Sequence, residues 1–530
     1  MKLHTKWARW INGLILSAAC TLLVACGGGG SSSTPAPGGS STPIAPSAVL
    51  QGSVNDAASG AGLSGVQVSV GTLSTVTNAS GTYTLSVGTG TLVVSFRKAG
   101  YAEQTMVNSD LVNSGDSSYL NASMLQFAQS TVLTGTGAQT VTVAGSAAAV
   151  GLPVDGLRRS DGSLASGAVT VNLTPINPAT NVNTMPGSLV TMSAGTAVPI
   201  ESFGALNVTI VDSTGAELNL RSGQSATIRI PAVSRGAALP ATIPLFHFNT
   251  TTGQWVEEGI ATLVGSGANA YYEGTVTHFS TWNADKRVDT VVINGCVQNA
   301  SGTAVVNARV TSEGIDYVGS AGASTDSQGR FSISAKRDAR VALTASVNGR
   351  AGTSVAVSTG SANQTLTACL TLTQAAVKIK LSWGASPSDL DSHIWVPSST
   401  GSAQEVYYGS SGSLSATPYV NLDVDDTSSF GPEYITLGRI ARGATYRYWV
   451  RNYSGTFSPG QTASPARVEL TVNGALTVFT PPVGEGTNRD WYAFDLVVDS
   501  NCNISVVPKN SWLNGSPAAP AYSGAPSYCN

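Results

Sequence analysis

Residues 50–70 read LQGSVNDAASGAGLSGVQVSV, and residues 77–87 read TNASGTYTLSV. A second copy of this pattern begins INGCVQNASGTAVVNARVTS at residues 293–312 and ends TDSQGRFSISA at residues 325–335. Each copy predicts a strand, a polar turn, a second strand and a T-[ND]-x-x-G hairpin, because Asn, Asp and Gly tolerate the positive φ angles of tight turns. The repeat therefore predicts two copies of one β-rich module.

Equivalent positions in the two copies keep the same kind of side chain. They are Gly52 and Gly295, Val54 and Val297, Asn78 and Asp326, Gly81 and Gly329, and Tyr83 and Phe331. Period-two alternation places Tyr83, Leu85 and Val87 on one face of a strand, and Phe331 and Ile333 on one face of the matching strand. Both strands are thus expected to be half buried.

At these residues both copies resemble the carboxypeptidase regulatory-like domain, a small transthyretin-like Greek-key sandwich. The first copy continues to Lys98-Ala99-Gly100-Tyr101, which also fits that family. The resemblance implies β-sandwiches at residues 48–128 and 287–373, and it implies no catalytic residue.

Residues 129–286 are expected to form a separate β-rich module. Ala226, Ile228 and Ile230 alternate with polar residues, and Asn-rich turns separate short strands. The segment is similar to a module that follows regulatory-like domains in other secreted proteins, including cartilage intermediate layer protein, and that similarity implies no activity.

Two histidines of this middle module lie among aromatic residues. His247 and His278 would suit a metal or catalytic site, but simple packing is the favoured interpretation. In that interpretation the imidazoles are hydrogen-bonded beside their aromatic neighbours, which are Phe246, Phe248, Phe279 and Trp282.

A fourth module is expected at residues 374–507, where Val377, Ile379, Leu381 and Trp383 alternate strictly with polar residues. Its motif W-G-x-x-P-x-D-L-D-S-H, together with LDVDDTSSFGPE at residues 422–433, resembles the YfaP-like domain of bacterial secreted proteins. A Pro- and Ser-rich tail, 508–530, is expected to fold back through Cys529. The predicted fold class is all-β: tandem β-sandwiches of Greek-key, transthyretin- or immunoglobulin-like type.

The N-terminus has the pattern of a secretory signal, with basic residues before a short apolar stretch at residues 11–24. That stretch is shorter than the roughly 20 residues of a transmembrane helix. Leu23-Val24-Ala25-Cys26 resembles the lipobox of bacterial lipoproteins. The resemblance implies a signal peptide at residues 1–25, diacylglycerol on the Cys26 thiol and, with Gly27 next, sorting to the outer membrane. The alternative is an ordinary signal peptide with a chance cysteine.

A linker follows Cys26, and the overall charge of the chain argues against one class of partner. Residues 26–47 carry the lipidated cysteine and a Gly/Ser/Pro linker expected to be flexible. Charged residues make up 11% of the chain, against about 25% in average proteins. Removal of the signal and its three basic residues lowers the formal net charge from −3 to −6. No basic run remains, which argues against nucleic acid as a partner.

Four cysteines remain after cleavage and lipidation, and four cysteines allow three pairings. Pairing of Cys296 with Cys369 and of Cys502 with Cys529 is favoured, because each pair falls within one proposed module. No C-x-x-C occurs, which argues against redox catalysis and a zinc ribbon.

The fourth module contains a group of acidic residues. By period two, Asp389 and Asp391 share a face, as do Asp423 and Asp425, with Asp426 adjacent and Glu433 after a Gly-Pro turn. Clustered carboxylates repel unless a cation joins them, and Ca²⁺ takes six to eight oxygen ligands. The hypothesis is a Ca²⁺ site on these six residues.

Two alternatives to that site stay open, and the first of them, turn capping, is the favoured interpretation. The carboxylates could cap turns and pair with Arg439, Arg442 or Arg447, or they could contact a ligand without metal. His393 is expected to orient a carboxylate rather than bind Ca²⁺.

A second candidate site is the strand TYRYWVRN. Period two places Arg447, Trp449 and Arg451 on one face and Tyr446, Tyr448 and Val450 on the other. If the second face is core, the indole is exposed as a platform for sugars or peptides; plain Arg–Trp stacking is the alternative.

The sequence favours a non-catalytic function. It contains no H-E-x-x-H, no G-x-S-x-G and no phosphate-binding Gly-rich loop. The expected role is binding or adhesion at the cell envelope, with a glycan or an envelope protein as partner and membrane lipid reached through acylated Cys26. A structural or envelope-assembly spacer is the alternative, and a hydrolase acting through Asp389 or Asp423 is the third hypothesis.

Overall fold

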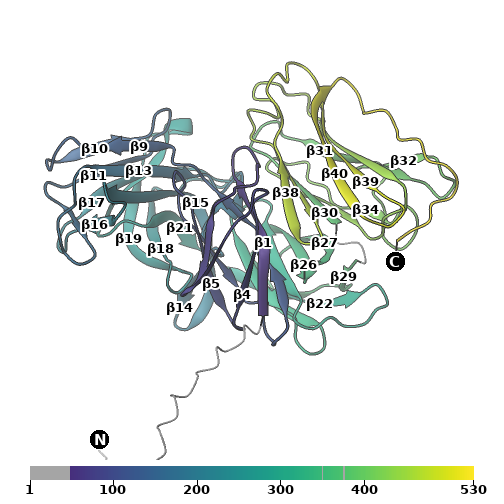
Figure 1. Cartoon of the computed structure of the whole chain (residues 1–530), viewed down its shortest axis with the longest axis horizontal. Coiled ribbons are helices and arrows are strands. Elements are labelled where there is room, and N and C mark those ends of the chain that lie inside the picture. The colour runs from purple at the N-terminus through teal and green to yellow at the C-terminus, as the bar shows by residue number, and fades with distance from the viewer. Residues whose placement is uncertain (1–47, 349, 374–376, 530) are drawn as a thin grey trace, which may run out of the picture. The chain divides into compact units, whose positions relative to one another are not determined.

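The computed structural model describes residues 48–348, 350–373 and 377–529, which fold almost entirely into β-strands (Figure 1). Within those ranges the helical elements are two 3₁₀ turns, η1 (Val182–Thr184) and η2 (Gly267–Asn269). The predicted all-β fold class is confirmed. A search of the described ranges finds no helix with the length and hydropathy needed to cross a membrane. Cys26, with the expected signal and linker, lies outside the described residues.

The first repeat forms two facing sheets of four strands each. Its strands are β1 (Ala48–Asp56), β2 (Gln67–Val70), β3 (Leu73–Val76), β4 (Thr82–Val87), β5 (Leu92–Arg97), β6 (Gln104–Asn108), β7 (Ser117–Tyr119) and β8 (Ala122–Met124). One sheet has the order β4-β1-β7, with β8 also on β1, and the other has the order β3-β2-β5-β6. Tyr83, Leu85 and Val87 are buried in the core between them, as the alternation predicts.

The second repeat repeats the strand pairings of the first and adds one. Its strands are β22 (Thr290–Asn299), β23 (Arg309–Gly314), β24 (Ser320–Ser324), β25 (Arg330–Lys336), β26 (Arg340–Val347), β27 (Arg350–Ser358), β28 (Gln364–Thr365) and β29 (Leu370–Leu372). As in the first copy, the opening strand β22 pairs antiparallel with β25 and parallel with β28 and β29. The added pairing, between β27 and β29, joins the strands of this copy into a single eight-stranded sheet. The register also repeats, since Gly52 faces Tyr83 and Gly295 faces Phe331.

The hairpin turn explains the repeated sequence. Asn78 accepts hydrogen bonds from the amides of Ser80 and Thr82 at 3.0 Å each. Asp326 does the same for residues 328 and 330, at 2.8 and 2.9 Å. Gly81 has a φ of 81°, which a residue with a side chain adopts only at a cost.

The middle module is one large sheet that curls around its own core. Its strands are β9 (Gln129–Val132), β10 (Gln139–Thr142), β11 (Ala149–Leu152), β12 (Leu157–Arg159), β13 (Val169–Ile176), β14 (Val190–Ser193), β15 (Thr196–Asp212), β16 (Glu217–Leu220), β17 (Ala226–Pro231), β18 (Thr242–Asn249), β19 (Gln254–Val264), β20 (Tyr271–Val276) and β21 (Thr281–Arg287). They form a 13-stranded sheet with the main order β10-β11-β17-β20-β19-β18-β21-β15-β13-β9. Ala226, Ile228 and Ile230 of β17 lie in its main core.

The C-terminal sandwich packs a six-stranded sheet on a five-stranded sheet (Figure 1). Its strands are β30 (Val377–Ser382), β31 (Leu390–Pro397), β32 (Ala403–Val406), β33 (Gly412–Ser413), β34 (Val420–Val424), β35 (Glu433–Leu437), β36 (Thr445–Asn452), β37 (Arg467–Val472), β38 (Ala475–Phe479), β39 (Asp490–Val498) and β40 (Ile504–Leu513). The sheet orders are β33-β34-β35-β30-β37-β38 and β32-β31-β36-β39-β40. The expected boundary after residue 507 is wrong, because β40 runs across it and stays paired with β39.

Two disulfides form with the favoured pairing. Cys296 is bonded to Cys369 within the second repeat, and Cys502 is bonded to Cys529. The second bond ties the C-terminal segment back onto the sandwich, where Cys529 is part of the core.

Candidate metal centre

The acidic residues of the C-terminal sandwich come from both of its sheets. Asp389 directly precedes β31 and Asp391 lies in it, on the five-stranded sheet. Asp425 and Asp426 follow β34, and Glu433 begins β35, on the six-stranded sheet. The start of β31 therefore faces the end of β34 and the start of β35, so that acids from two sheets meet at one end of the sandwich.

Two loops hold these strand ends together. The amide of Ser429 donates to the carbonyl of Ser388 at 2.8 Å, and the amide of Phe430 donates to the carbonyl of Gly384 at 3.1 Å. Ser429, Phe430 and Gly431 have φ angles of 80°, 67° and 73°. Non-glycine residues in this region cost roughly 1 kcal/mol or more each and persist where surrounding contacts hold them. The loop after β34 is thus fixed in an uncommon conformation beside the acids.

Three carboxylates converge closely enough to share one ion. Asp391, Asp425 and Glu433 each offer an oxygen, and these oxygens lie within 4.8 Å of one another. Asp391 is 3% exposed and Glu433 is fully buried, whereas Asp425 is exposed. An ion could therefore enter from solvent past Asp425 and reach two buried ligands.

Several carboxylate oxygens in this group have no hydrogen-bond donor. They are Asp389 Oδ1, Asp391 Oδ2, Asp426 Oδ2 and Glu433 Oε1, all buried and unpaired within the described part of the chain. A buried charged oxygen without a partner costs more than the 1–3 kcal/mol of a buried neutral group. Four such oxygens in one place make this cluster a candidate cation site.

The pKa values of two of the clustered carboxylates also indicate that these two groups lack a positive partner. Burial, followed by the nearby carboxylates of Asp391, Asp425 and Asp426, raises the pKa of Asp389 to about 7. Burial and Asp391 also raise the pKa of Glu433 well above its usual range. A divalent cation would reverse this effect, since it favours the charged forms.

Protein donors satisfy only part of the cluster. The amide of Ser392 donates to Glu433 Oε2 at 2.6 Å. Arg340, from β26, donates to Asp426 Oδ1 at 3.1 Å. These bonds fix the orientation of the two side chains and leave their other oxygens for an ion.

Asp423 does not belong to the site, contrary to the period-two expectation. Its carboxylate accepts hydrogen bonds from the amide of Ser354 at 2.9 Å and from Thr436 Oγ1, and it lies 4.0 Å from Lys378 Nζ. The pairing of β34 with β35 shifts register between Leu422 and Val424. That bulge breaks the alternation, so Asp423 and Asp425 have different neighbours.

The arginines that the capping alternative named interact with other groups. Arg439 stacks on Tyr419, Arg442 donates to the carbonyl of Ser500, and Arg447 donates to the carbonyl of Ala518. His393 orients a carboxylate, but its closest one is Glu405, 2.6 Å from Nδ1, while Asp391 is 3.9 Å from Nε2.

The predicted Arg447–Trp449–Arg451 platform is wrong because Trp449 is fully buried. The alternation itself is correct, since Tyr446, Tyr448 and Val450 lie in the core and Trp449 does not. The indole is covered on the outer face by His393, whose ring centroid is 5.1 Å away, and by Trp395 at 5.7 Å.

The C-terminal segment helps to cover that face. Trp395 Nε1 donates to the carbonyl of Pro517 at 2.9 Å, and Tyr522 donates to the carbonyl of Thr445 at 2.6 Å. Trp449 is therefore a buried packing residue beneath the end of the chain.

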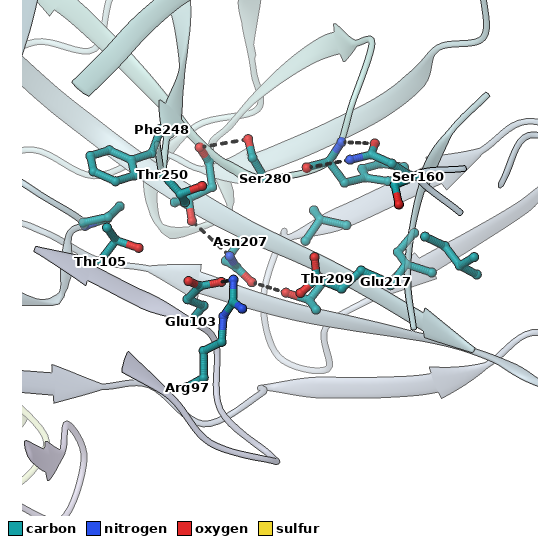
Figure 2. Close-up of a pocket in the computed structure, with 17 residues that line it drawn as sticks. Arg97, Glu103, Thr105, Ser160, Asn207, Thr209, Glu217, Phe248, Thr250 and Ser280 are labelled. Atoms are coloured by element: carbon teal, nitrogen blue, oxygen red, sulfur yellow. Dashed lines mark hydrogen bonds and ion pairs between the residues drawn. The ribbon is translucent and has the colours of Figure 1, made fainter. Parts of the chain in front are cut away.

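A polar pocket of about 270 Å³ lies between β5, β6 and β15 (Figure 2). Arg97 and Glu103 form an ion pair at 2.9 Å there. Asn207 accepts a hydrogen bond from Thr209 Oγ1 and donates one to Thr281 Oγ1. Of the groups named, only Glu103 leaves a buried oxygen, Oε1, without a hydrogen-bond partner among the described residues, so the pocket is a weaker candidate for a charged ligand than the acidic cluster with its four unpaired oxygens.

The two histidines of the middle module pack against an aromatic residue, as the favoured interpretation expects, but not against all of the expected ones. His247 and His278 both lie against Trp282, with ring centroids 5.5 and 4.9 Å from the indole. Phe246 and Phe248 point into a different core. Glu258, which the sequence analysis did not single out, contacts both imidazoles.

No family model matches the chain, and no curated protein matches it. Among solved structures, SAV2460, a protein of unknown function, is 18% identical over 27% of this chain and 91% of that chain, with a TM-score of 0.21. The Bacillus anthracis TIE protein is 11% identical over 61% of this chain and 50% of that chain, with a TM-score of 0.14. Likenesses this weak carry no argument about function.

Proposed function

We propose that this chain is a non-catalytic binding protein of the bacterial cell envelope, anchored by lipid on Cys26, whose C-terminal sandwich binds Ca²⁺. The calcium proposal rests on one observation, the unpaired buried oxygens of Asp389, Asp391, Asp426 and Glu433. The anchor is supported by the Leu-Val-Ala-Cys motif that ends at Cys26.

The chemistry of the donors favours Ca²⁺ over other ions. Every group in the cluster offers carboxylate oxygen, the ligand of hard cations. Ca²⁺ accepts six to eight oxygens in flexible geometry, whereas Mg²⁺ demands near-ideal octahedral geometry and keeps most of its waters. Ligands drawn from three separate loop and strand ends, two of them buried, suit the larger ion.

The cluster differs from a turn-capping aspartate elsewhere in the same sandwich. Asp499 accepts hydrogen bonds from the amides of Asn501 and Asn503 at 2.8 Å each. Hydrogen bonds from Asn503 lower the pKa of Asp499, whereas the pKa values of Asp389 and Glu433 are raised. Capping therefore accounts for Asp499 and not for the cluster.

The spacing of the carboxylates supports a binding role over hydrolysis. Glycosidases hold their two carboxyl groups about 5–5.5 Å or 6.5–9.5 Å apart to leave room for substrate or water. The oxygens of Asp391, Asp425 and Glu433 lie within 4.8 Å of one another, which suits a single shared ion.

Calorimetric titration of the purified chain tests the calcium proposal. We expect one Ca²⁺ per chain at the acidic cluster, weaker binding of Mg²⁺, and a lower melting temperature after chelator treatment. Absence of Ca²⁺ binding, together with a melting curve that chelator leaves unchanged, would refute it.

The binding role needs a separate measurement. Glycan arrays and immobilised envelope proteins should be probed with the chain in Ca²⁺ and in chelator. Binding that requires Ca²⁺ supports the proposed role. If the chain binds Ca²⁺ but binds neither the glycan arrays nor the envelope proteins, the alternative in which the sandwiches act as spacers is favoured.

A further inference from the structure

A second group of metal-binding side chains lies in the middle module, far from the acidic cluster in sequence. His247 belongs to β18, Glu258 to β19, and His278 to the loop between β20 and β21. β18 pairs with both β19 and β21, so the three side chains are brought to one face of the sheet. One atom from each lies within 4.8 Å of the others.

A bulge places the carboxylate. The pairing of β18 with β19 shifts register between Pro244 and Phe246, so that Glu257 pairs with Phe246 and Ile260 with Pro244. Glu258 and Gly259 together lie opposite the single residue Leu245, and Gly259 has a φ of 91°. Bulges of this kind re-aim a side chain, and here Glu258 is turned toward both histidines.

The distances fit a shared metal ion better than hydrogen bonds. Glu258 Oε2 lies 3.6 Å from His247 Nε2 and 3.5 Å from His278 Nε2, beyond the usual N–H···O range of about 2.7–3.2 Å. Donor atoms that surround a tetrahedral Zn²⁺ at about 2.0–2.1 Å stand about 3.4 Å apart. An octahedral ion, whose neighbouring ligands subtend a right angle, would draw the donors closer.

Neighbouring residues orient the ligands. Thr277 Oγ1 donates to Glu258 Oε1 at 2.6 Å, which leaves Oε2 to face the imidazoles. The Trp282 indole packs against both imidazole rings and donates from Nε1 to the carbonyl of His278 at 3.0 Å. Such outer contacts are a usual property of protein metal sites.

The group is partly open to solvent. The side chains of His247, His278 and Glu258 are 14%, 31% and 37% exposed. An ion held by the two histidine Nε2 atoms and by Glu258 Oε2 would have three protein ligands. Its fourth coordination position would be free for water, which is the arrangement of open zinc sites. Imidazole nitrogen suits Zn²⁺ and other d-block ions and not Ca²⁺.

We infer that His247, Glu258 and His278 bind one Zn²⁺ ion, with the fourth coordination position open to water or to a donor atom from another molecule. This site is independent of the proposed calcium site, because it shares no residue with the acidic cluster and two of its three donors are imidazole nitrogens.

Metal titration of the whole chain tests the inference. We expect one Zn²⁺ bound per chain in the presence of excess Ca²⁺, and a Co²⁺ derivative with the visible absorption bands of a tetrahedral ion. Failure of Zn²⁺ to bind, or a Co²⁺ spectrum of six-coordinate type, would overturn the assignment.

Three variants and one matched control locate the ion. H278A and E258Q should each weaken Zn²⁺ binding more than tenfold, because each removes a ligand. T277V should weaken it about 10- to 100-fold, because the Thr277 hydroxyl orients the Glu258 carboxylate. E257Q is the control, because Glu257 pairs with Arg287 instead of the histidines and should bind Zn²⁺ like the wild type. Circular dichroism confirms that each variant is folded. Zn²⁺ binding that survives H278A and E258Q in folded protein, or that E257Q weakens equally, would overturn the inference.

Discussion

Asp423 and Asp425 are two residues apart and equally acidic, yet we expect their substitution by Asn to have opposite consequences. Asp425→Asn should weaken Ca²⁺ binding, because Asp425 is a ligand in the proposed site. It should not lower the free energy of unfolding without calcium, because the Asp425 carboxylate is exposed and repels its acidic neighbours there. Asp423→Asn should destabilise the sandwich and leave calcium affinity nearly unchanged, because its carboxylate accepts hydrogen bonds from Ser354 and Thr436.

The size of each effect follows from the contacts. A unit negative charge and a divalent ion about 2.4 Å apart attract by about 3 kcal/mol even at the dielectric constant of water. Loss of the Asp425 charge should therefore raise the Kd for Ca²⁺ about a hundredfold. Asp423 accepts charge-assisted hydrogen bonds, worth about 1.5–3 kcal/mol each, and lies 4.0 Å from buried Lys378. Its loss should lower the free energy of unfolding by about 3–5 kcal/mol.

Both quantities are measurable on the same samples. Calorimetry gives the Kd for Ca²⁺, and urea unfolding in chelator, followed by tryptophan fluorescence, gives the stability. The reasoning is refuted if Asp425→Asn binds Ca²⁺ like the wild type, or if Asp423→Asn abolishes binding while stability is retained.

Three further results are expected. Burial raises the pKa of Asp285 well above its ordinary value, so its contribution to stability is full in acid and is lost as the pH rises toward the folded-state pKa. Asp285→Asn should therefore stabilise the chain more at pH 7 than at pH 4, by up to about 1.4 kcal/mol per pH unit between the two pKa values; urea unfolding curves that shift equally at both pH values would contradict this. Replacing Cys502 and Cys529 by Ala opens a loop with a sequence separation of 27 and should cost about 3.5 kcal/mol of unfolding free energy, and unchanged denaturation midpoints would count against it. Mass spectrometry of the protein from a bacterial host should find an acylated N-terminus at Cys26, and an intact signal would argue against the anchor.

Much of the local structure could be predicted because it depends on neighbours in sequence. The T-[ND]-x-x-G turns formed at Asn78 and Asp326 because their side chains bond to amides two and four residues ahead. Period two placed Tyr446, Tyr448 and Val450 on one face of their strand, and the structure buries that face in the core. In the acidic cluster, five of the six predicted residues come together, and the sixth, Asp423, was misplaced by a bulge that no local pattern indicates.

The sequence alone determined the strand patterning, the repeated turns and the types of ligand atom that the chain offers, because these follow from the covalent geometry of each residue and its near neighbours. Tertiary structure decided which of those side chains meet. Trp449 is buried because His393 and Trp395 stack over it, and Glu433 reaches Asp391 because two sheets face each other. Such contacts depend on sheet register and packing between distant segments, which a one-dimensional pattern does not encode.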